Sequence, residues 1–82
     1  MKHGTIVRNL WQPSYESLLV YTGISGKYAK CLWVIDGVFL GMHDFYKADI
    51  LNDREHFPIV GFVNMADAIK AGLFPTDKED GE

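Results

Sequence analysis

The sequence predicts a mainly β domain, either a small five-stranded SH3-like barrel or a curled antiparallel sheet, with one short C-terminal helix. Three observations predict this class. Short runs rich in β-branched and aromatic residues alternate with turn signals along the chain. Asp-Gly, a strong hairpin signal, separates two of these runs at positions 36 and 37. Helix signals gather at one place, residues 64–72. A four-stranded sheet backed by the helix is the alternative.

The predicted hairpin joins residues 28–35 to residues 38–43 through Asp36 and Gly37. A type I′ turn requires positive φ at both central positions, and Asp-Gly is a favoured pair for it. Side chains alternate across a strand, so residues 28–35 present two faces. One face is wholly apolar and is the expected core side: Ala29, Cys31, Trp33 and Ile35. The other face is mixed: Tyr28, Lys30, Leu32 and Val34.

Three more strands are expected, over residues 4–9, 17–22 and 59–64. Gly61 interrupts the last of them, and Gly41 predicts a bulge or a bend in the return strand of the hairpin. Residues 10–16 contain Pro13 and are expected to form a loop, because proline cannot donate to a central strand. Residues 44–58 leave two interpretations open, a long loop or a short helical turn that begins near Asp44.

The predicted helix has a recognisable beginning and end. Asn64 is a favoured N-cap residue, and Asp67 follows three positions later as in a capping box. Lys70 lies in the last turn and Gly72 just beyond it, both typical of a helix C-terminus. A short apolar stripe is expected to anchor this helix: Met65, Ala68 and Ile69.

The chain of 82 residues predicts one domain over residues 1–75, in which Leu73 and Phe74 dock as the chain leaves the helix. Residues 76–82 are expected to be a disordered acidic tail. This tail holds four acidic residues and one lysine, so it carries the whole net charge of −3. The rest of the chain has no net charge, because its basic and acidic residues balance. This balance argues against non-specific binding to nucleic acid or to an anionic membrane.

Cysteine usage and the N-terminal residues predict a location. The single cysteine, Cys31, cannot form an intramolecular disulfide, and it lies within an apolar strand. No apolar run is long enough for a signal peptide or a membrane span. A cytoplasmic protein is therefore expected.

The first quarter of the chain resembles a group of small bacterial proteins. The matching residues are Gly4-Thr5-Ile6-Val7-Arg8-Asn9, Trp11, Leu18-Leu19-Val20-Tyr21 and Gly23. They are similar to the openings of small uncharacterised proteins from phages and mobile elements of Gram-positive bacteria. Those proteins have an acidic residue where this chain has Thr5. The resemblance implies an accessory role in a mobile element and supplies no functional residues.

Residues 43–56 hold the densest cluster of metal-ligating side chains: His43, Asp44, Asp49, Asp53, Glu55 and His56. His43 and His56 are the weak metal candidates, since they could meet if this segment folds back on itself. The chain lacks the H-x-x-x-H, C-x-x-C and H-x-E spacings of known sites. The carboxylates are therefore expected to cap turns or to pair with Lys47 and Arg54, and no metal or cofactor is expected.

Signals of catalysis are weak throughout the chain. No serine lies in a G-x-S-x-G elbow, and Cys31 lies in the middle of a strand. Residues 23–27, GISGK, are too short for a phosphate-binding loop and precede a strand rather than a helix. We therefore expect a protein that is not an enzyme.

The aromatic residues are the more informative set. Some are expected on loops or on the mixed strand face: Trp11, Tyr15, Tyr21, Tyr28, Phe45 and Tyr46. Others are assigned to the core: Trp33, Phe39 and Phe62. Exposed rings can form a groove for an extended peptide or stack on bases, and otherwise they plug the open ends of the barrel. The partner-binding candidates are Trp11, Tyr15, Tyr28 and Tyr46.

Charge separates the two kinds of partner. A nucleic-acid site would use Lys27, Tyr28 and Lys30, but the neutral body offers few cations to pair with phosphates. We therefore expect a non-enzymatic interaction module that binds a protein partner, including a second copy of itself through an unpaired edge strand. Weak binding of single-stranded nucleic acid is the alternative, and metal binding is the third.

Overall fold

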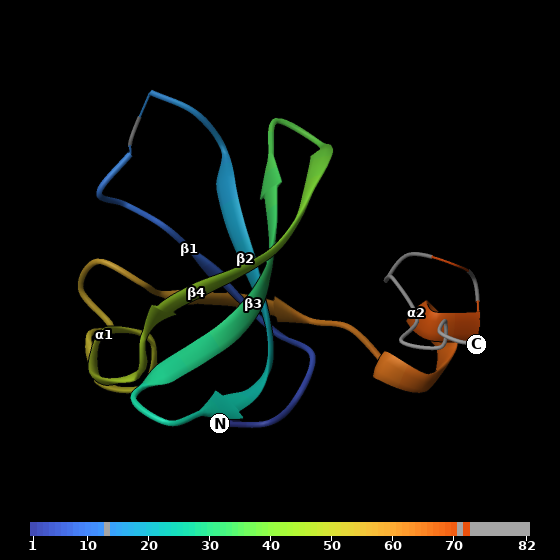
Figure 1. Cartoon of the computed structure of the whole chain (residues 1–82). Helices are drawn as coiled ribbons and strands as arrows, with labels where there is room; N and C mark the ends of the chain where they lie inside the picture. Colours follow the sequence, from blue (N-terminus) through green and yellow to red (C-terminus); the bar gives the residue numbers. More distant parts are fainter. Residues whose placement is uncertain (13, 71, 73–82) are drawn as a thin grey trace.

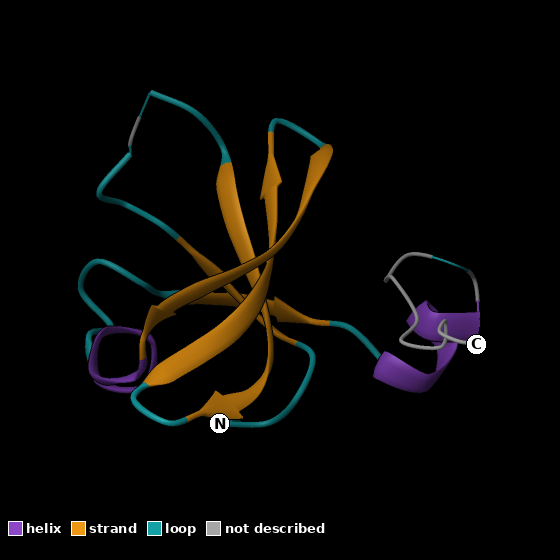
Figure 2. Cartoon of the chain, viewed as in Figure 1, coloured by secondary structure: helices purple, strands orange, loops and turns teal. Residues whose placement is uncertain are grey.

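The computed structural model describes residues 1–12, 14–70 and 72, and within them it contains five strands and two short helices (Figure 1). Their bounds in chain order are β1 Thr5–Arg8, β2 Ser17–Ser25, β3 Tyr28–Ile35, β4 Val38–Tyr46, α1 Lys47–Asn52, β5 Ile59–Phe62 and α2 Met65–Lys70. The strands form one antiparallel sheet in the order β4-β3-β2-β1-β5. The sheet is strongly curled (Figure 2). The mainly β prediction is confirmed, and the four-stranded alternative is wrong.

The Asp36-Gly37 turn has the predicted geometry. Asp36 has φ 49° and Gly37 has φ 81°, so both central positions are positive as a type I′ turn requires. Asp36 of the turn is also hydrogen-bonded to Glu16, the residue that precedes β2. The Asp36 N–H donates to the Glu16 carbonyl at 2.9 Å, and the Asp36 carboxylate accepts from the Glu16 N–H at 3.0 Å. These bonds link the tip of the hairpin to the β1–β2 loop.

β4 is longer than predicted and contains the predicted bulge. Val34 pairs with Phe39 and Trp33 pairs with Gly41, which leaves Leu40 as the extra residue. Gly41 has φ 95°, a conformation that glycine adopts without a steric penalty. Pairing with β3 then continues through Tyr46, so the helical turn begins at Lys47 rather than near Asp44. The sequence could not show this extension, because it depends on the length of the partner strand.

Two apolar clusters lie on opposite faces of the sheet. The inner cluster consists of Val7, Leu19, Tyr21, Ala29, Cys31, Ile50 and Phe57. The outer cluster consists of Val20, Leu32, Val34 and Ala68. The prediction that Ala29 and Cys31 face the core is confirmed, because neither side chain is exposed. The mixed face of β3 is more buried than predicted, since Leu32 and Val34 are only 2% and 8% exposed.

Helix α2 contributes two residues to the outer cluster. Asn64 caps α2 as predicted, with its side-chain oxygen accepting from the Asp67 N–H at 3.1 Å. Met65 and Ala68 pack in the outer cluster. The Ile69 side chain, residues 73 and 74, and the predicted tail over residues 76–82 lie outside the described residues. Among the described residues, no helix is long and apolar enough to cross a membrane.

Three aromatic assignments are wrong. Tyr21 is only 4% exposed, because β2 is an interior strand of the sheet and its inner face is covered. Phe39 and Phe62 are 53% and 64% exposed, because β4 and β5 are the two edge strands. Trp33, also assigned to the core, is partly buried: it packs against the inner cluster, and its indole N–H donates to the Ser17 hydroxyl at 2.9 Å. Phe45 is half-buried against the same cluster.

Candidate functional site

The most accessible pairing surface of the sheet is β4. It forms one edge and has nine residues, whereas β5 forms the other edge and has four. The side of β4 that faces away from β3 pairs with no strand in the described part of the chain. An unpaired edge presents a row of free N–H and C=O groups, to which an extended peptide can add as a further strand.

The positions of these free groups follow from the hydrogen-bond pattern. Lys47 N–H donates to the Lys27 carbonyl at 3.0 Å, which marks this pair as hydrogen-bonded. Hydrogen-bonded and non-hydrogen-bonded pairs alternate along an antiparallel ladder. The backbone groups of Met42, Asp44 and Tyr46 therefore point away from β3, toward the open edge.

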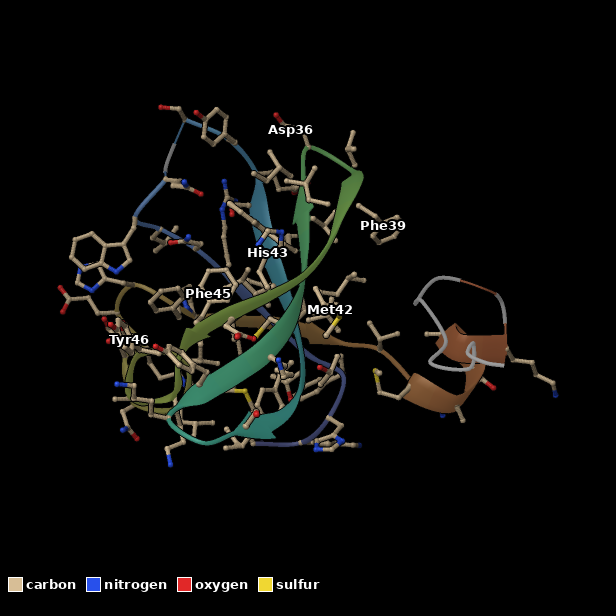
Figure 3. The ribbon with its side chains drawn as sticks, in the orientation of Figure 1. Asp36, Phe39, Met42, His43, Phe45 and Tyr46 are labelled. Atoms are coloured by element: carbon tan, nitrogen blue, oxygen red, sulfur yellow. The ribbon has the colours of Figure 1, made fainter. Side chains whose placement is uncertain are left out.

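The side chains along β4 are mostly apolar and exposed: Val38, Phe39, Leu40, Met42 and Tyr46. Phe39 and Met42 point to the side of the sheet on which α2 lies, whereas His43 and Phe45 point to the other side (Figure 3). Asp44 is the one formally charged residue of the strand, and its carboxylate lies 2.9 Å from Lys30 Nζ. We refer to strand Val38–Tyr46 with these exposed side chains as the β4 edge.

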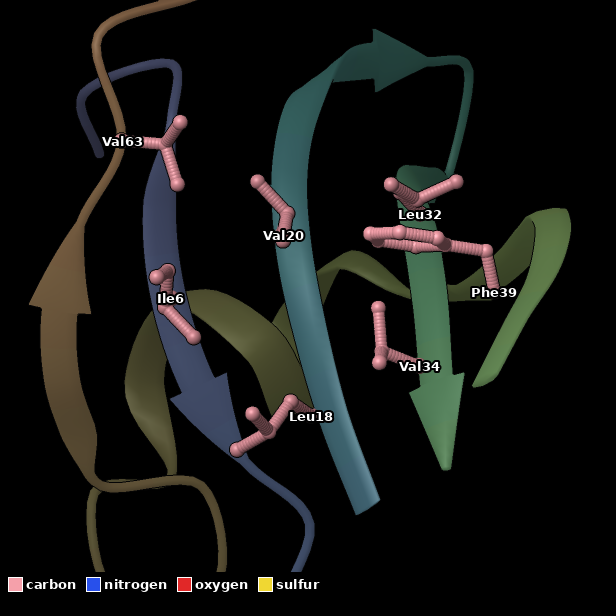
Figure 4. A pocket seen from close by; sticks show the side chains of 7 residues that line it. All are labelled: Ile6, Leu18, Val20, Leu32, Val34, Phe39 and Val63. Carbon is pink, nitrogen blue, oxygen red and sulfur yellow. The ribbon is translucent and has the colours of Figure 1, made fainter. Parts of the chain in front are cut away.

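A groove on the outer face meets the β4 edge at Phe39. It has a volume of about 230 Å³, and every residue that lines it is apolar (Figure 4): Ile6, Leu18, Val20, Leu32, Val34, Phe39 and Val63. The groove therefore suits an apolar side chain and offers no polar group to hold a charged ligand. Because Phe39 belongs to both features, a segment that pairs with β4 would lie beside this groove.

A pair of tyrosines lies at the far end of β4. Tyr28 and Tyr46 stack with ring centroids 5.6 Å apart and an interplanar angle of 26°, and Lys27 Nζ lies 5.8 Å from the Tyr28 centroid. Two of the four partner-binding candidates are thus adjacent. Lys30, a residue of the nucleic-acid alternative, is paired with Asp44. Its charge is therefore partly neutralised for a phosphate group.

The other two partner-binding candidates lie on the β1–β2 loop. Trp11 is 63% exposed and Tyr15 is 46% exposed. The Trp11 ring stacks on His56 with centroids 4.1 Å apart and an interplanar angle of 15°. The Trp11 N–H donates to the Asn9 side chain at 3.0 Å. These contacts position Trp11, whose indole stays largely exposed.

The two histidine candidates contact different neighbours. His43 packs edge-on against Trp33, with centroids 4.8 Å apart. His56 Nδ1 lies 2.9 Å from an Asp53 carboxylate oxygen. In residues 1–12, 14–70 and 72, no group of three or more His, Cys, Asp or Glu side chains is arranged to hold a metal ion.

Asp53 caps a turn, as expected for the carboxylates of this segment. Its side chain accepts from the His56 backbone N–H at 3.1 Å. This hydrogen bond lowers the pKa of the Asp53 carboxyl, and the hydrogen bond with the His56 ring lowers it further by a smaller amount. The Arg54 guanidinium donates to the carbonyls of Leu51 and Phe57, each at 2.9 Å. Arg54 thus pairs with backbone carbonyls and not with the predicted carboxylates.

Cys31 is fully buried in the inner cluster. Burial, with a smaller contribution from the Asp44 charge, raises the pKa of its thiol to about 12. A thiol in this environment stays protonated at neutral pH and behaves as a small apolar side chain.

The exposed apolar half of β4 was missed by the sequence prediction. Residues 38–42, VFLGM, are apolar without alternation directly after the turn, and this pattern is the signal that both faces of the strand carry apolar side chains.

Comparison with models of known protein families finds no match for the chain. No match is found among curated proteins or among solved structures either.

Proposed function

We propose that the protein is a non-enzymatic interaction module that binds an extended segment of a protein partner as an additional strand along β4. The observation that carries the proposal is a nine-residue edge with exposed apolar side chains and a single formal charge. Natural edge strands are usually blocked by lysine, proline or a covering element, because a free edge pairs readily with other chains. Within the described residues, β4 carries a bulge at Leu40 and one charge at Asp44, but it has no lysine or proline, and no further strand pairs with its open side.

The β4 edge and the groove support different parts of recognition. Main-chain hydrogen bonds to Met42, Asp44 and Tyr46 would supply affinity for any extended segment. The groove beside Phe39 would select an apolar side chain of the partner. The stacked rings of Tyr28 and Tyr46 add contact area at the end of the strand.

The proposal also includes the biological setting. The resemblance in residues 4–23 supports an accessory role in a mobile element. The single buried thiol of Cys31 is compatible with the reducing environment of the cytoplasm. The partner in this setting would be a protein that offers an extended, partly apolar segment.

The tyrosine pair supports a second candidate function, weak binding of single-stranded nucleic acid. Exposed rings stack on bases irrespective of sequence, and Lys27 lies beside the Tyr28 ring. We rank this function second because Lys30 is engaged by Asp44. Its test is the salt dependence of oligonucleotide binding, which is steep when lysines contact phosphates.

Selection of displayed random peptides on the immobilised protein tests the first function. We expect enriched peptides of alternating apolar residues that bind the wild type and bind Met42→Lys at least about tenfold more weakly, because a lysine on an edge opposes strand addition. Val60→Lys, which places the same charge at an exposed apolar site on β5, is the control and should bind like the wild type. Peptides that bind all three proteins equally would contradict the proposal.

A further inference from the structure

We infer that the β4 edge pairs with the β4 edge of a second copy of this chain, antiparallel and about a two-fold axis, so that the two sheets become one. This inference rests on the proposed function, because it uses the same edge. An isologous interface must be self-complementary. An antiparallel strand meets this condition, since each residue with outward backbone groups offers both a donor and an acceptor.

The length of the edge favours a second copy. β4 has nine residues and contains no proline, and beyond the bulge at Leu40 the outward groups of Met42, Asp44 and Tyr46 are available to a partner strand. The two copies present edges of the same length. β5 has four residues and would form a much shorter ladder. Pairing along β4 also covers the apolar side chains that the strand leaves exposed in one copy: Val38, Phe39, Leu40 and Met42.

Charge allows two copies to approach. Each copy brings one formal charge on β4, that of Asp44, and Lys30 of the same chain lies 2.9 Å from it. The pairs Lys30–Asp44 of the two copies therefore add no net charge at the interface.

The same charge restricts the register. Residues with outward backbone groups must pair with one another, which places the axis at a residue between Met42 and Tyr46. An axis at Phe45 or Tyr46 would pair only the very end of β4, so Met42, His43 and Asp44 are the positions that give a longer ladder. Like charges directly opposite each other destabilise a sheet, which disfavours the register with Asp44 opposite its own copy. The axis is therefore at Met42 or at His43. In either register, the apolar start of one β4 lies near Phe45 and Tyr46 of the second copy.

Light scattering coupled to size-exclusion chromatography tests the assembly. We expect the wild type at twice the mass of one chain, Met42→Lys at the mass of one chain, and the control Val60→Lys at twice the mass. Circular dichroism spectra and melting curves establish that both variants fold. A wild type that stays monomeric up to its solubility limit, or an assembly that Val60→Lys breaks and Met42→Lys leaves intact, would overturn the inference.

Disulfide trapping tests the register without weakening the interface. Opposite residues at a two-fold axis have Cα atoms about 4.5 to 5.5 Å apart, within the range of about 4.4 to 6.8 Å that a disulfide spans. Met42→Cys or His43→Cys should therefore give a covalent dimer under mild oxidation, many-fold faster than the control Val60→Cys. The native Cys31 is buried and does not compete. Equal rates for all three variants would contradict pairing through β4.

The outcomes separate this inference from the proposed function. The wild type could be monomeric and still bind selected peptides, with binding lost in Met42→Lys. That result would contradict pairing with a second copy and support the proposed interaction module. A monomeric wild type that selects no peptide removes both.

Discussion

The inner and the outer cluster lie on opposite faces of β2 and β3, and they differ in what covers them. α1 and the segment after it close the inner face, where Ile50 and Phe57 are 0% and 5% exposed. Among the described residues outside the sheet, Met65 and Ala68 of the short helix α2 contact the outer cluster. An apolar groove of about 230 Å³ remains beside it.

This difference separates stability from interaction within one small sheet. The seven residues of the inner cluster are almost completely buried, and the Ser17 hydroxyl beside them accepts the Trp33 indole N–H. The outer face continues into the exposed β4 edge through Phe39. We therefore expect changes on the inner face to affect the free energy of unfolding, and changes on the outer face and its edge to affect binding.

Two adjacent leucines on β2 give the sharpest test of this comparison. Leu19 is fully buried in the inner cluster, whereas Leu18 is half-buried and lines the groove. Leu19→Ala should lower the free energy of unfolding by about 3 kcal/mol, because it leaves a closed cavity. Leu18→Ala should lower it by about 1 kcal/mol. Urea unfolding monitored by tryptophan fluorescence measures both, and equal losses would mean that the two faces are equally closed.

Stability at alkaline pH tests how completely the inner cluster excludes solvent. The raised pKa of Cys31, from 9.0 to about 12, means that the folded state holds a proton that the unfolded state releases. Stability is therefore lost as pH rises from about 9 through 12, by about 4 kcal/mol in total for this thiol, because each unit of pKa shift corresponds to about 1.4 kcal/mol. The raised pKa of Tyr21 acts in the same direction.

Unfolding free energies measured across this pH range, for the wild type and for Cys31→Ala, isolate the contribution of the thiol. The variant should lose less stability than the wild type between the two ends of the range. A native thiol that reacts with a disulfide reagent at pH 9 as fast as an unfolded one would contradict a closed inner cluster.

Removal of the α2 cap tests the covering of the outer face. Asn64→Ala should destabilise the protein by about 1 kcal/mol, because the Asp67 N–H loses its acceptor. Amide hydrogen exchange should accelerate in α2 and leave β2 and β3 protected. Asn64→Asp retains an acceptor at the cap and is the matched control. Faster exchange throughout the sheet would show that α2 supports the whole fold.

The Lys30–Asp44 ion pair should matter least for stability. Both side chains are 49% exposed, and ion pairs in solvent contribute little. Lys30→Ala should change the free energy of unfolding by less than about 0.5 kcal/mol. Thermal melts at low and high salt measure it, with Lys27→Ala as a control at an exposed lysine. A loss above about 1 kcal/mol would assign the pair a structural role.

Features with local causes could be predicted from the sequence. The Asp36-Gly37 turn, the Gly41 bulge and the Asn64 cap each depend on the conformational preferences of one or two residues. Alternation along residues 28–35 also identified the inner face correctly. The candidate site was predicted only in part. Tyr28 and Tyr46 were identified, whereas Phe39 and Met42 of the β4 edge were not.

What the sequence by itself determined is thus the set of turns, the cap and the apolar face of the central hairpin. Only the tertiary structure decided that Tyr21 is buried and that Phe39 and Phe62 are exposed. The physical reason is that a strand's burial depends on whether it has one neighbour or two. That number is set by pairing between residues far apart in the chain, such as Thr5 with Phe62, and no local pattern encodes it.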